Sequence, residues 1–245
     1  MKQSIFTLRS NEALTDCVYK MVLEGDTSAI TAPGQFVNLQ LEGLFLRRPI
    51  SVCDYDSRTL TLIYKVVGKG TELMSHMIPG TELDLLTGLG NGYDLTVSGD
   101  SPVLIGGGVG VPPMYNLAKK LLSQGKSVTV ILGFNTKSEI FYEEEFKALG
   151  CKTLVTTVDG SYGIKGFVTN ALETLSYTYF YTCGPEPMLK AVYRSSQTSG
   201  QMSFEKRMGC GFGACMGCSC KTITGYKRIC KEGPVMRKEE ILWEN

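Results

Sequence analysis

Five of the nine cysteines in this 245-residue chain lie together between residues 210 and 230. Their spacing is Cys210-x4-Cys215-x2-Cys218-x11-Cys230, with Cys220 as a further thiol inside the run. C-x4-C-x2-C followed by a distant cysteine is the spacing of plant-type [2Fe–2S] ligands. Clustered cysteines are also typical of ligand sites rather than of disulfide frameworks in a reducing compartment. The pattern therefore predicts a [2Fe–2S] cluster.

Three thiolates on one short loop can converge on a cluster only if the loop curls sharply. Glycines supply the positive φ angles and the close backbone approach that this needs, and the loop contains Gly209, Gly211, Gly213 and Gly217. We expect Cys230 rather than Cys220 as the fourth ligand, because a later position can close the cage from a separate strand. A structural zinc site, which also uses four thiolates, is the alternative, although zinc sites more often show paired C-x2-C motifs.

The elements that must position this loop fall into three regions. Residues 1–98 contain short alternating or β-branched runs, such as 35–41 and 59–67, punctuated by Pro-Gly and Asn-Gly turns. This texture predicts an antiparallel β-barrel with one short helix near 71–76.

Residues 99–200 alternate between strands and helices. Strands are expected at 102–106, 127–134, 152–158 and 178–184, and helices at 113–125, 139–150, 166–175 and 186–200. Alternation of this kind predicts a parallel sheet with helices on both faces. Residues 201–245 form the small cysteine-rich region, which has too few aliphatic residues to bury a core alone and would be organised by a bound metal centre.

Arg48-Pro49-Ile50-Ser51 follows a strand of the first region. Alone, this tetrad is typical of a surface turn. Here the tetrad lies in a predicted barrel that precedes an α/β region. In this context it resembles the Arg-x-Tyr-Ser motif that binds flavin in the ferredoxin reductase superfamily. The resemblance implies that Arg48 pairs with the FAD pyrophosphate and that Ser51 lies against the isoalloxazine. Ile50 replaces the aromatic residue, so ring stacking must come from elsewhere or be apolar packing.

The second half of the implied flavin site comprises Ile63, Tyr64 and Lys65, together with Gly70 and Thr71. Gly70-Thr71 opens a short helix, where backbone N–H groups and a hydroxyl can face a phosphate. A Gly-Thr pair is otherwise typical of an ordinary helix N-cap.

A glycine-rich turn joins the first strand and helix of the second region, and includes Gly108 and Gly110. It lacks the G-x-G-x-x-G fingerprint and resembles the G-x-G-x-x-P turn of ferredoxin reductases. Cys183-Gly184-Pro185 ends the last strand, at the edge where open α/β sheets bind ligands. The same superfamily places a Cys-Gly-Pro near the nicotinamide. The resemblance implies an NAD site here, and selection between NAD and NADP is not readable.

Charge and hydropathy limit the remaining functions. The chain carries 25 basic and 24 acidic residues, a net charge of +1, so no basic excess points to nucleic acid. No apolar run approaches the length of a membrane span and no secretory signal is visible, so we expect a cytoplasmic protein.

The order of flavin barrel, nucleotide region and C-terminal cluster resembles the family of electron-transfer subunits of type B dihydroorotate dehydrogenases. The resemblance covers essentially the whole chain through RRPIS, YKVVGKGT, GGGVGVPP, DGSYGIKG, CGPEPM and CGFGACMGCSC. It implies FAD, a [2Fe–2S] cluster and NAD as acceptor. It also implies a catalytic FMN subunit that oxidises dihydroorotate to orotate for pyrimidine biosynthesis, in a heterotetramer of two plus two subunits.

Two other functions stay open. One is a sibling role, as the reductase subunit of a hydrogenase or of a ferredoxin:NADP oxidoreductase. The other is a non-enzymatic, metal-stabilised redox module. The identity of the bound partner distinguishes the sibling role from the role that the family resemblance implies. The visible spectrum of the pure protein distinguishes the non-enzymatic module from both.

Overall fold

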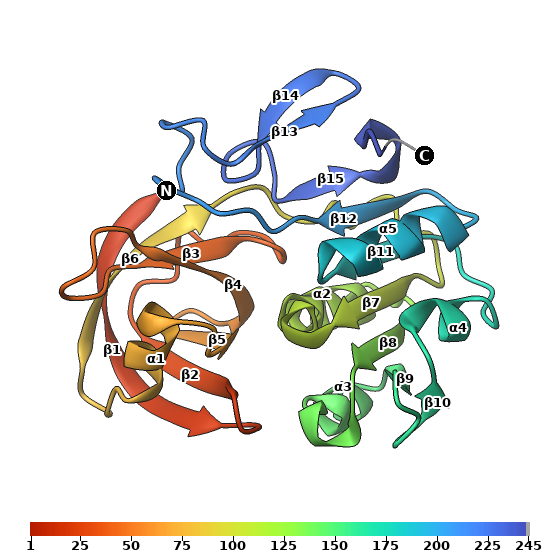
Figure 1. Cartoon of the computed structure of the whole chain (residues 1–245), viewed down its shortest axis with the longest axis horizontal. Coiled ribbons are helices and arrows are strands. Elements are labelled where there is room, and N and C mark those ends of the chain that lie inside the picture. Colours follow the sequence, from red (N-terminus) through yellow and green to blue (C-terminus); the bar gives the residue numbers. More distant parts are fainter. Residues whose placement is uncertain (244–245) are drawn as a thin grey trace.

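The structure is a computed structural model that describes residues 1–243. A β-barrel and an α/β body lie side by side, and the cysteine-rich tail crosses one end of both (Figure 1). Among the described residues, none of the helices has the length and apolar character needed to cross a membrane.

The first region forms the predicted antiparallel barrel. Six strands close in the order β1–β2–β5–β4–β3–β6. Their bounds are β1 Lys2–Ala13, β2 Val18–Glu24, β3 Phe36–Leu39, β4 Arg48–Tyr55, β5 Thr59–Lys65 and β6 Glu82–Leu89, and the short helix α1 spans Lys69–Ser75. Alternate side chains of these strands point inward and form one core cluster, which includes Phe6, Met21, Val37 and Leu60.

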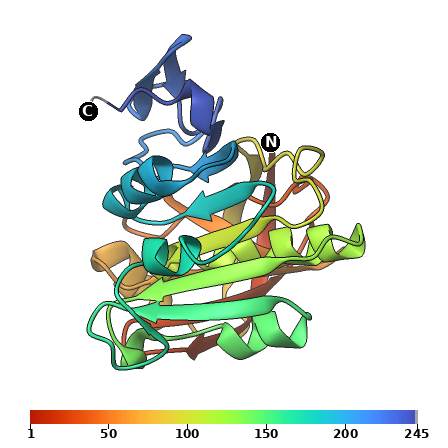
Figure 2. The same ribbon diagram turned by 90° about the vertical axis from the view of Figure 1, so that its right-hand side faces the viewer.

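Five strands of the second region join β12 and β15 of the tail in a sheet of seven strands in the order β10–β9–β8–β7–β11–β12–β15 (Figure 2). The strands are β7 Val103–Gly107, β8 Thr129–Phe134, β9 Lys152–Thr157, β10 Ile164–Lys165, β11 Phe180–Cys183, β12 Gly200–Ser203 and β15 Val235–Arg237. The helices are α2 Pro112–Ser123, α3 Glu143–Ala148, α4 Val168–Leu172 and α5 Glu186–Ser195. Helices α2 and α3 contribute to one core cluster and α4 and α5 to another, so both faces of the sheet are covered as predicted.

Three predicted helices are clearly shorter in the structure. The helix expected at 166–175 spans only Val168–Leu172. The helix expected at 139–150 begins only at Glu143, because Tyr142 adopts a left-handed backbone with φ of 67°. The prediction of a helix over 186–200 is wrong beyond Ser195. Gly200 begins strand β12 instead, and a Cβ atom there would lie 2.2 Å from the ring of Phe180. Glycine at this position therefore lets β12 pair with β11.

The tail does not build a core of its own. Strands β13 (Ser219–Thr222) and β14 (Gly225–Arg228) form a two-stranded hairpin, and β15 pairs antiparallel with β12 of the large sheet. Cys218, Ile229, Cys230 and Met236 share a core cluster with residues of the barrel and the sheet, such as Phe36. The tail is thus fixed against both other regions, and the division at residues 98/99 and 200/201 stays a prediction.

A polar contact joins the barrel to the α/β body. Asp54 of β4 accepts a hydrogen bond from Asn116 Nδ2 at 2.7 Å and pairs with Lys119 Nζ at 2.6 Å, both from helix α2. Strand β4 also carries the Arg48–Ser51 segment. This contact therefore fixes the position of the nucleotide region relative to the implied flavin site.

Candidate functional site

The cysteine loop curls through three left-handed backbone positions. Gly211 and Gly213 have φ of 77° and 93°, and Met216 has φ of 61°. The curl turns backbone N–H groups toward sulfur: Ala214 and Cys215 donate to the Cys210 Sγ at 3.2 and 3.4 Å. Donors of this kind favour a thiolate, so the local fold suits negatively charged sulfur.

The four predicted ligands meet as two pairs. The Cys210 and Cys215 thiols interact with each other. The Cys230 thiol interacts with that of Cys218, and the Cys230 N–H also donates to the Cys218 Sγ at 3.4 Å. The segment before Cys230 contacts the loop that carries Cys210 and Cys215, because Arg228 Nη1 donates to the Gly213 carbonyl at 2.6 Å.

Cys220 lies on strand β13 opposite Lys227, and it packs against the core cluster that contains Cys218 and Cys230. Its pKa is raised, first by burial, and the only cysteine among the groups that perturb it is Cys218. Among residues 1–243, no three His, Cys, Asp or Glu side chains are already grouped tightly enough to hold a single ion.

Within the loop, the pKa of the Cys210 thiol is lowered to about 6. Burial alone raises it, but backbone N–H donors from Cys215, Phe212 and Ala214 outweigh burial. The pKa of Cys230 is raised to about 12, first by burial and then by the neighbouring Cys218. The two pairs therefore differ in environment, one under backbone donors near the surface and the other buried.

The two adjacent arginines, Arg47 and Arg48, have different partners in the structure. Arg47 forms a bidentate ion pair with Asp84, with nitrogen–oxygen distances of 2.9 and 3.1 Å. Arg48 hydrogen-bonds only to the backbone carbonyl groups of Leu46 and Arg47, and has no acidic partner within the described part of the chain. Its charge is therefore available to an anion, whereas that of Arg47 is neutralised.

Gly70 makes room for Arg48. A Cβ atom at Gly70 would lie 2.1 Å from the Arg48 Nε, so only glycine permits this approach. Thr71 is buried, and its hydroxyl donates to the Gly68 carbonyl and accepts from the N–H groups of Val67 and Gly68. The Thr71 hydroxyl thus caps its own loop, and its predicted contact with phosphate stays a prediction.

The strand residues of the implied flavin site are placed differently from one another. Ile63 and Tyr64 are buried, and the Tyr64 hydroxyl donates to Asn11 Oδ1 at 3.0 Å inside the barrel. Lys65 is exposed and points toward the α/β body. Pro49, Ile50 and Ser51 are half-buried on β4. Any ligand contact from Tyr64 would therefore involve its backbone.

The glycine turn and the Cys-Gly-Pro segment lie against each other. The turn forms a 3-10 helix at Gly108–Gly110, and a Cβ atom at Gly110 would lie 2.1 Å from the Cys183 carbonyl oxygen. Strands β7 and β11 are parallel neighbours, so Gly108 and Gly184 follow the same sheet edge. Cys183 is half-buried, and burial raises its pKa to about 12; Pro185 caps helix α5. The structure therefore brings the two predicted nucleotide segments together.

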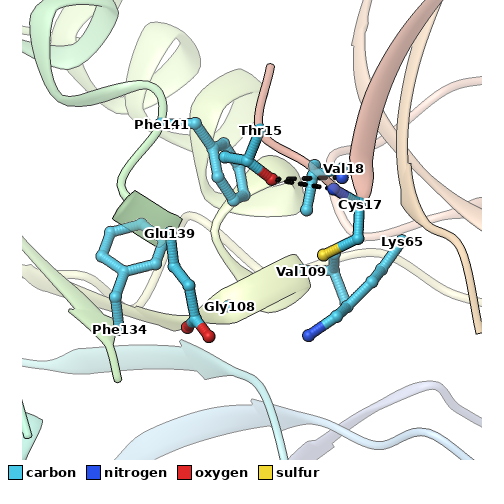
Figure 3. Close-up of a pocket in the computed structure, with 9 residues that line it drawn as sticks. All are labelled: Thr15, Cys17, Val18, Lys65, Gly108, Val109, Phe134, Glu139 and Phe141. Atoms are coloured by element: carbon cyan, nitrogen blue, oxygen red, sulfur yellow. Dashed lines mark hydrogen bonds between the residues drawn. The ribbon is translucent and has the colours of Figure 1, made fainter. Parts of the chain in front are cut away.

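A small cavity of about 30 Å³ opens between the barrel and this sheet edge. Figure 3 shows Lys65 and Glu139 extending from opposite sides of it, with Gly108 and Val109 between them and Cys17 alongside. Sequence reasoning did not single out Cys17 or Glu139. Neither lies in a motif. Glu139 follows strand β8, the neighbour of β7 beside the turn, whereas Cys17 reaches the cavity from the barrel.

Comparison with known proteins agrees with this arrangement. Residues 104–194 match the oxidoreductase NAD-binding domain family, and residues 205–242 match the iron–sulfur cluster binding domain of dihydroorotate dehydrogenase B. The second match spans all four paired cysteines.

Curated relatives match over nearly the whole chain. The dihydroorotate dehydrogenase B (NAD(+)) electron transfer subunits of Bacillus pumilus (strain SAFR-032) and Fusobacterium nucleatum are 44% and 41% identical, each over 98% of this chain and over 98% and 99% of their own lengths.

Solved structures share the fold. An NADH-dependent reduced ferredoxin–NADP oxidoreductase superposes with a TM-score of 0.87 at 29% identity, over 97% of this chain and 90% of its own. A Neisseria gonorrhoeae ferredoxin NADP+ reductase gives a TM-score of 0.70 at 18% identity, over 80% and 90%, which shows the fold alone. With the paired cysteines, the glycine turn and full-length relatives above 40% identity, the chain belongs to the family of dihydroorotate dehydrogenase B (NAD(+)) electron transfer subunits.

Proposed function

We propose that this chain carries electrons between NAD and a catalytic dihydroorotate dehydrogenase subunit, using FAD and a [2Fe–2S] cluster. The observation that carries the proposal is the gathering of Cys210, Cys215, Cys218 and Cys230 into two neighbouring pairs on a flavin-reductase fold. Flavin exchanges a hydride with nicotinamide and single electrons with an iron–sulfur centre, so the three groups together supply a complete electron path.

The donor set fits a two-iron cluster. A [2Fe–2S] cluster bound by four cysteines presents two irons, so two thiol pairs side by side suit it. Cys210 and Cys215 would hold one iron, and Cys218 and Cys230 the other. The glycines of the loop let its backbone N–H groups face sulfur, where such donors tune the centre.

The barrel residues fit FAD. Arg48 offers a guanidinium without an acidic partner among the described residues, and guanidinium forks suit pyrophosphate oxygens. Gly70 leaves the space that this side chain occupies. In this proposal Ser51 and the neighbouring backbone of β4 orient the ring.

The sheet edge fits a nicotinamide nucleotide. Gly108 and Gly110 keep the turn free of side chains, and the turn leads directly into the twelve-residue helix α2. Cys183 and Gly184 lie beside it at the carboxyl ends of parallel strands, where α/β sheets bind ligands. These residues would hold NAD with its reactive end toward the barrel.

The names of the relatives describe one subunit of a dehydrogenase, and they therefore imply a second, catalytic subunit as the partner of this chain. We propose an FMN-containing catalytic subunit, in a heterotetramer of two plus two. The cluster loop presents apolar side chains to solvent, with Phe212 at 44% and Met216 at 53% exposure. Because this loop carries the cluster ligands, we place part of the subunit contact here.

A reductase for ferredoxin is the second candidate. It is favoured by the NADH-dependent reduced ferredoxin–NADP oxidoreductase, which superposes over 97% of this chain. The partner that binds the chain distinguishes the two functions.

Steady-state kinetics test the proposal. The isolated chain, loaded with FAD and cluster, is expected to pass electrons from NADH to an artificial dye and to leave dihydroorotate untouched. Adding the catalytic subunit should produce dihydroorotate-dependent reduction of NAD+, because proton abstraction and the first hydride transfer occur there. Oxidation of dihydroorotate by the isolated chain would refute the subunit role. Failure of the catalytic subunit to bind would favour the ferredoxin-linked function.

A further inference from the structure

Asn38 lies in the middle of β3 and is 1% exposed. Its strand neighbours Val37 and Leu39 point into the barrel core, so Asn38 points outward together with Phe36. That outer face packs against the cysteine-rich tail, since Phe36 shares a core cluster with Cys218 and Cys230.

The Asn38 side chain contacts the cluster loop directly. Its Nδ2 donates to the carbonyl oxygen of Cys210 at 3.4 Å, which fixes the orientation of the amide. A Cβ atom on Gly211 would lie 2.3 Å from the same Nδ2. The cluster loop is therefore packed directly against Asn38 at Cys210, the first predicted cluster ligand.

On its other side Asn38 adjoins the implied flavin strand. In the β3–β4 ladder Asn38 lies opposite Pro49, and Phe36 opposite Ser51. Directly opposed residues share a face, and Ser51 lies diagonally from Asn38 on that face. One buried side chain thus connects the Arg48–Ser51 segment to the cluster loop.

Only one end of the Asn38 amide is bonded to another protein group among the described residues. The Asn38 Oδ1 is fully buried and has no hydrogen-bond partner among the described residues. A buried acceptor without a partner destabilises the folded state, and an apolar residue of the same shape avoids that cost. The one bond that this amide makes within the described chain is therefore the one from its Nδ2 to the Cys210 carbonyl.

We propose that Asn38 is a positioning residue that fixes the distance between the flavin site and the cluster. The proposal rests on the function proposed above. NADH would deliver two electrons to the flavin as a hydride; one would pass on to the cluster and the other would stay on the flavin until a second transfer. Asn38 neither forms a bond nor takes a proton. It acts by holding the Cys210–Gly211 backbone against β4, because electron transfer slows steeply as the separation of the two centres grows.

Asn91 provides a matched control. It also joins the barrel region to the tail, with Nδ2 donating to the carbonyls of Glu232 and Val235 at 3.0 Å and Oδ1 accepting from the Val235 N–H at 3.1 Å. Both ends of this amide are bonded, and none of its partners is a predicted cluster ligand.

The test compares Asn38→Leu and Asn91→Leu with the wild type. Melting temperature is measured, together with the electron paramagnetic resonance spectrum of the reduced cluster and the stopped-flow rate at which NADH-derived electrons reach it. Asn38→Leu is expected to melt no lower than the wild type, yet to show an altered spectrum and a several-fold slower rate. Asn91→Leu is expected to melt lower with the wild-type spectrum and rate.

A wild-type rate and spectrum in Asn38→Leu would overturn the proposal, whatever its melting temperature. If leucine prevents folding, Asn38→Ala removes the same amide without requiring extra space. The rate and the spectrum of that variant then test the proposal in the same way. Absence of iron and FAD from the wild-type protein would instead refute the proposed function, so the two failures are distinguishable.

Discussion

Serine at Cys210, Cys215, Cys218 or Cys230 is expected to leave the protein without its iron–sulfur cluster, whereas Cys220→Ser keeps it. Each of the four supplies a thiolate that a serine hydroxyl does not replace, because the hydroxyl stays protonated near neutral pH. Cys220 lies on β13, whereas the Cys230 N–H donates to the Cys218 Sγ, so we expect Cys230 to supply the fourth thiolate and the Cys220 sulfur not to be needed.

Iron and acid-labile sulfide analysis of the five variants, with visible spectra, measures this outcome. Iron loss in Cys220→Ser together with an intact cluster in Cys230→Ser would reverse the ligand assignment. A colourless wild-type protein that contains zinc would establish the structural-zinc alternative.

Alanine at Arg48 is expected to raise the dissociation constant of FAD by about tenfold to hundredfold. A hydrogen bond to a charged group contributes roughly 1.5–3 kcal/mol, which corresponds to that range. Arg48 is the member of the basic pair whose guanidinium lacks an acidic partner in the part of the chain described by the structure.

Arg47→Ala is the matched control. Its guanidinium is held by Asp84, whose pKa it lowers through their hydrogen bonds. This variant should therefore bind FAD like the wild type and unfold at a lower temperature. Gel filtration followed by flavin quantification measures both variants, and full FAD retention by Arg48→Ala would exclude its role.

Local patterns predicted most of the architecture. The alternation of strands and helices predicts the parallel sheet that the structure shows, and the cysteine spacing predicts a ligand set that stays a prediction. The error at 186–200 has a physical cause. Gly200 reads as a helix stop, yet its missing side chain is needed because β12 packs against Phe180. That contact depends on the tertiary fold.

Contacts between distant segments account for the rest. The motif spacing selects Arg48 in the sequence, but the neutralisation of Arg47 by Asp84 on β6 is visible only in the fold. Asn38 and Cys210 are separated by 172 positions, so no motif connects them. The pairing of β15 with β12 likewise joins the tail to a sheet whose other strands lie earlier in the chain.

The central claim is that electrons pass between the two subunits through the cluster. The most direct measurement compares the complex of this chain and the catalytic subunit with the same complex carrying Cys215→Ser. The cluster-free complex is expected to retain NADH-to-dye transfer through FAD and to lose dihydroorotate-dependent NADH formation. A cluster-free complex that still forms NADH from dihydroorotate at the wild-type rate would contradict the account.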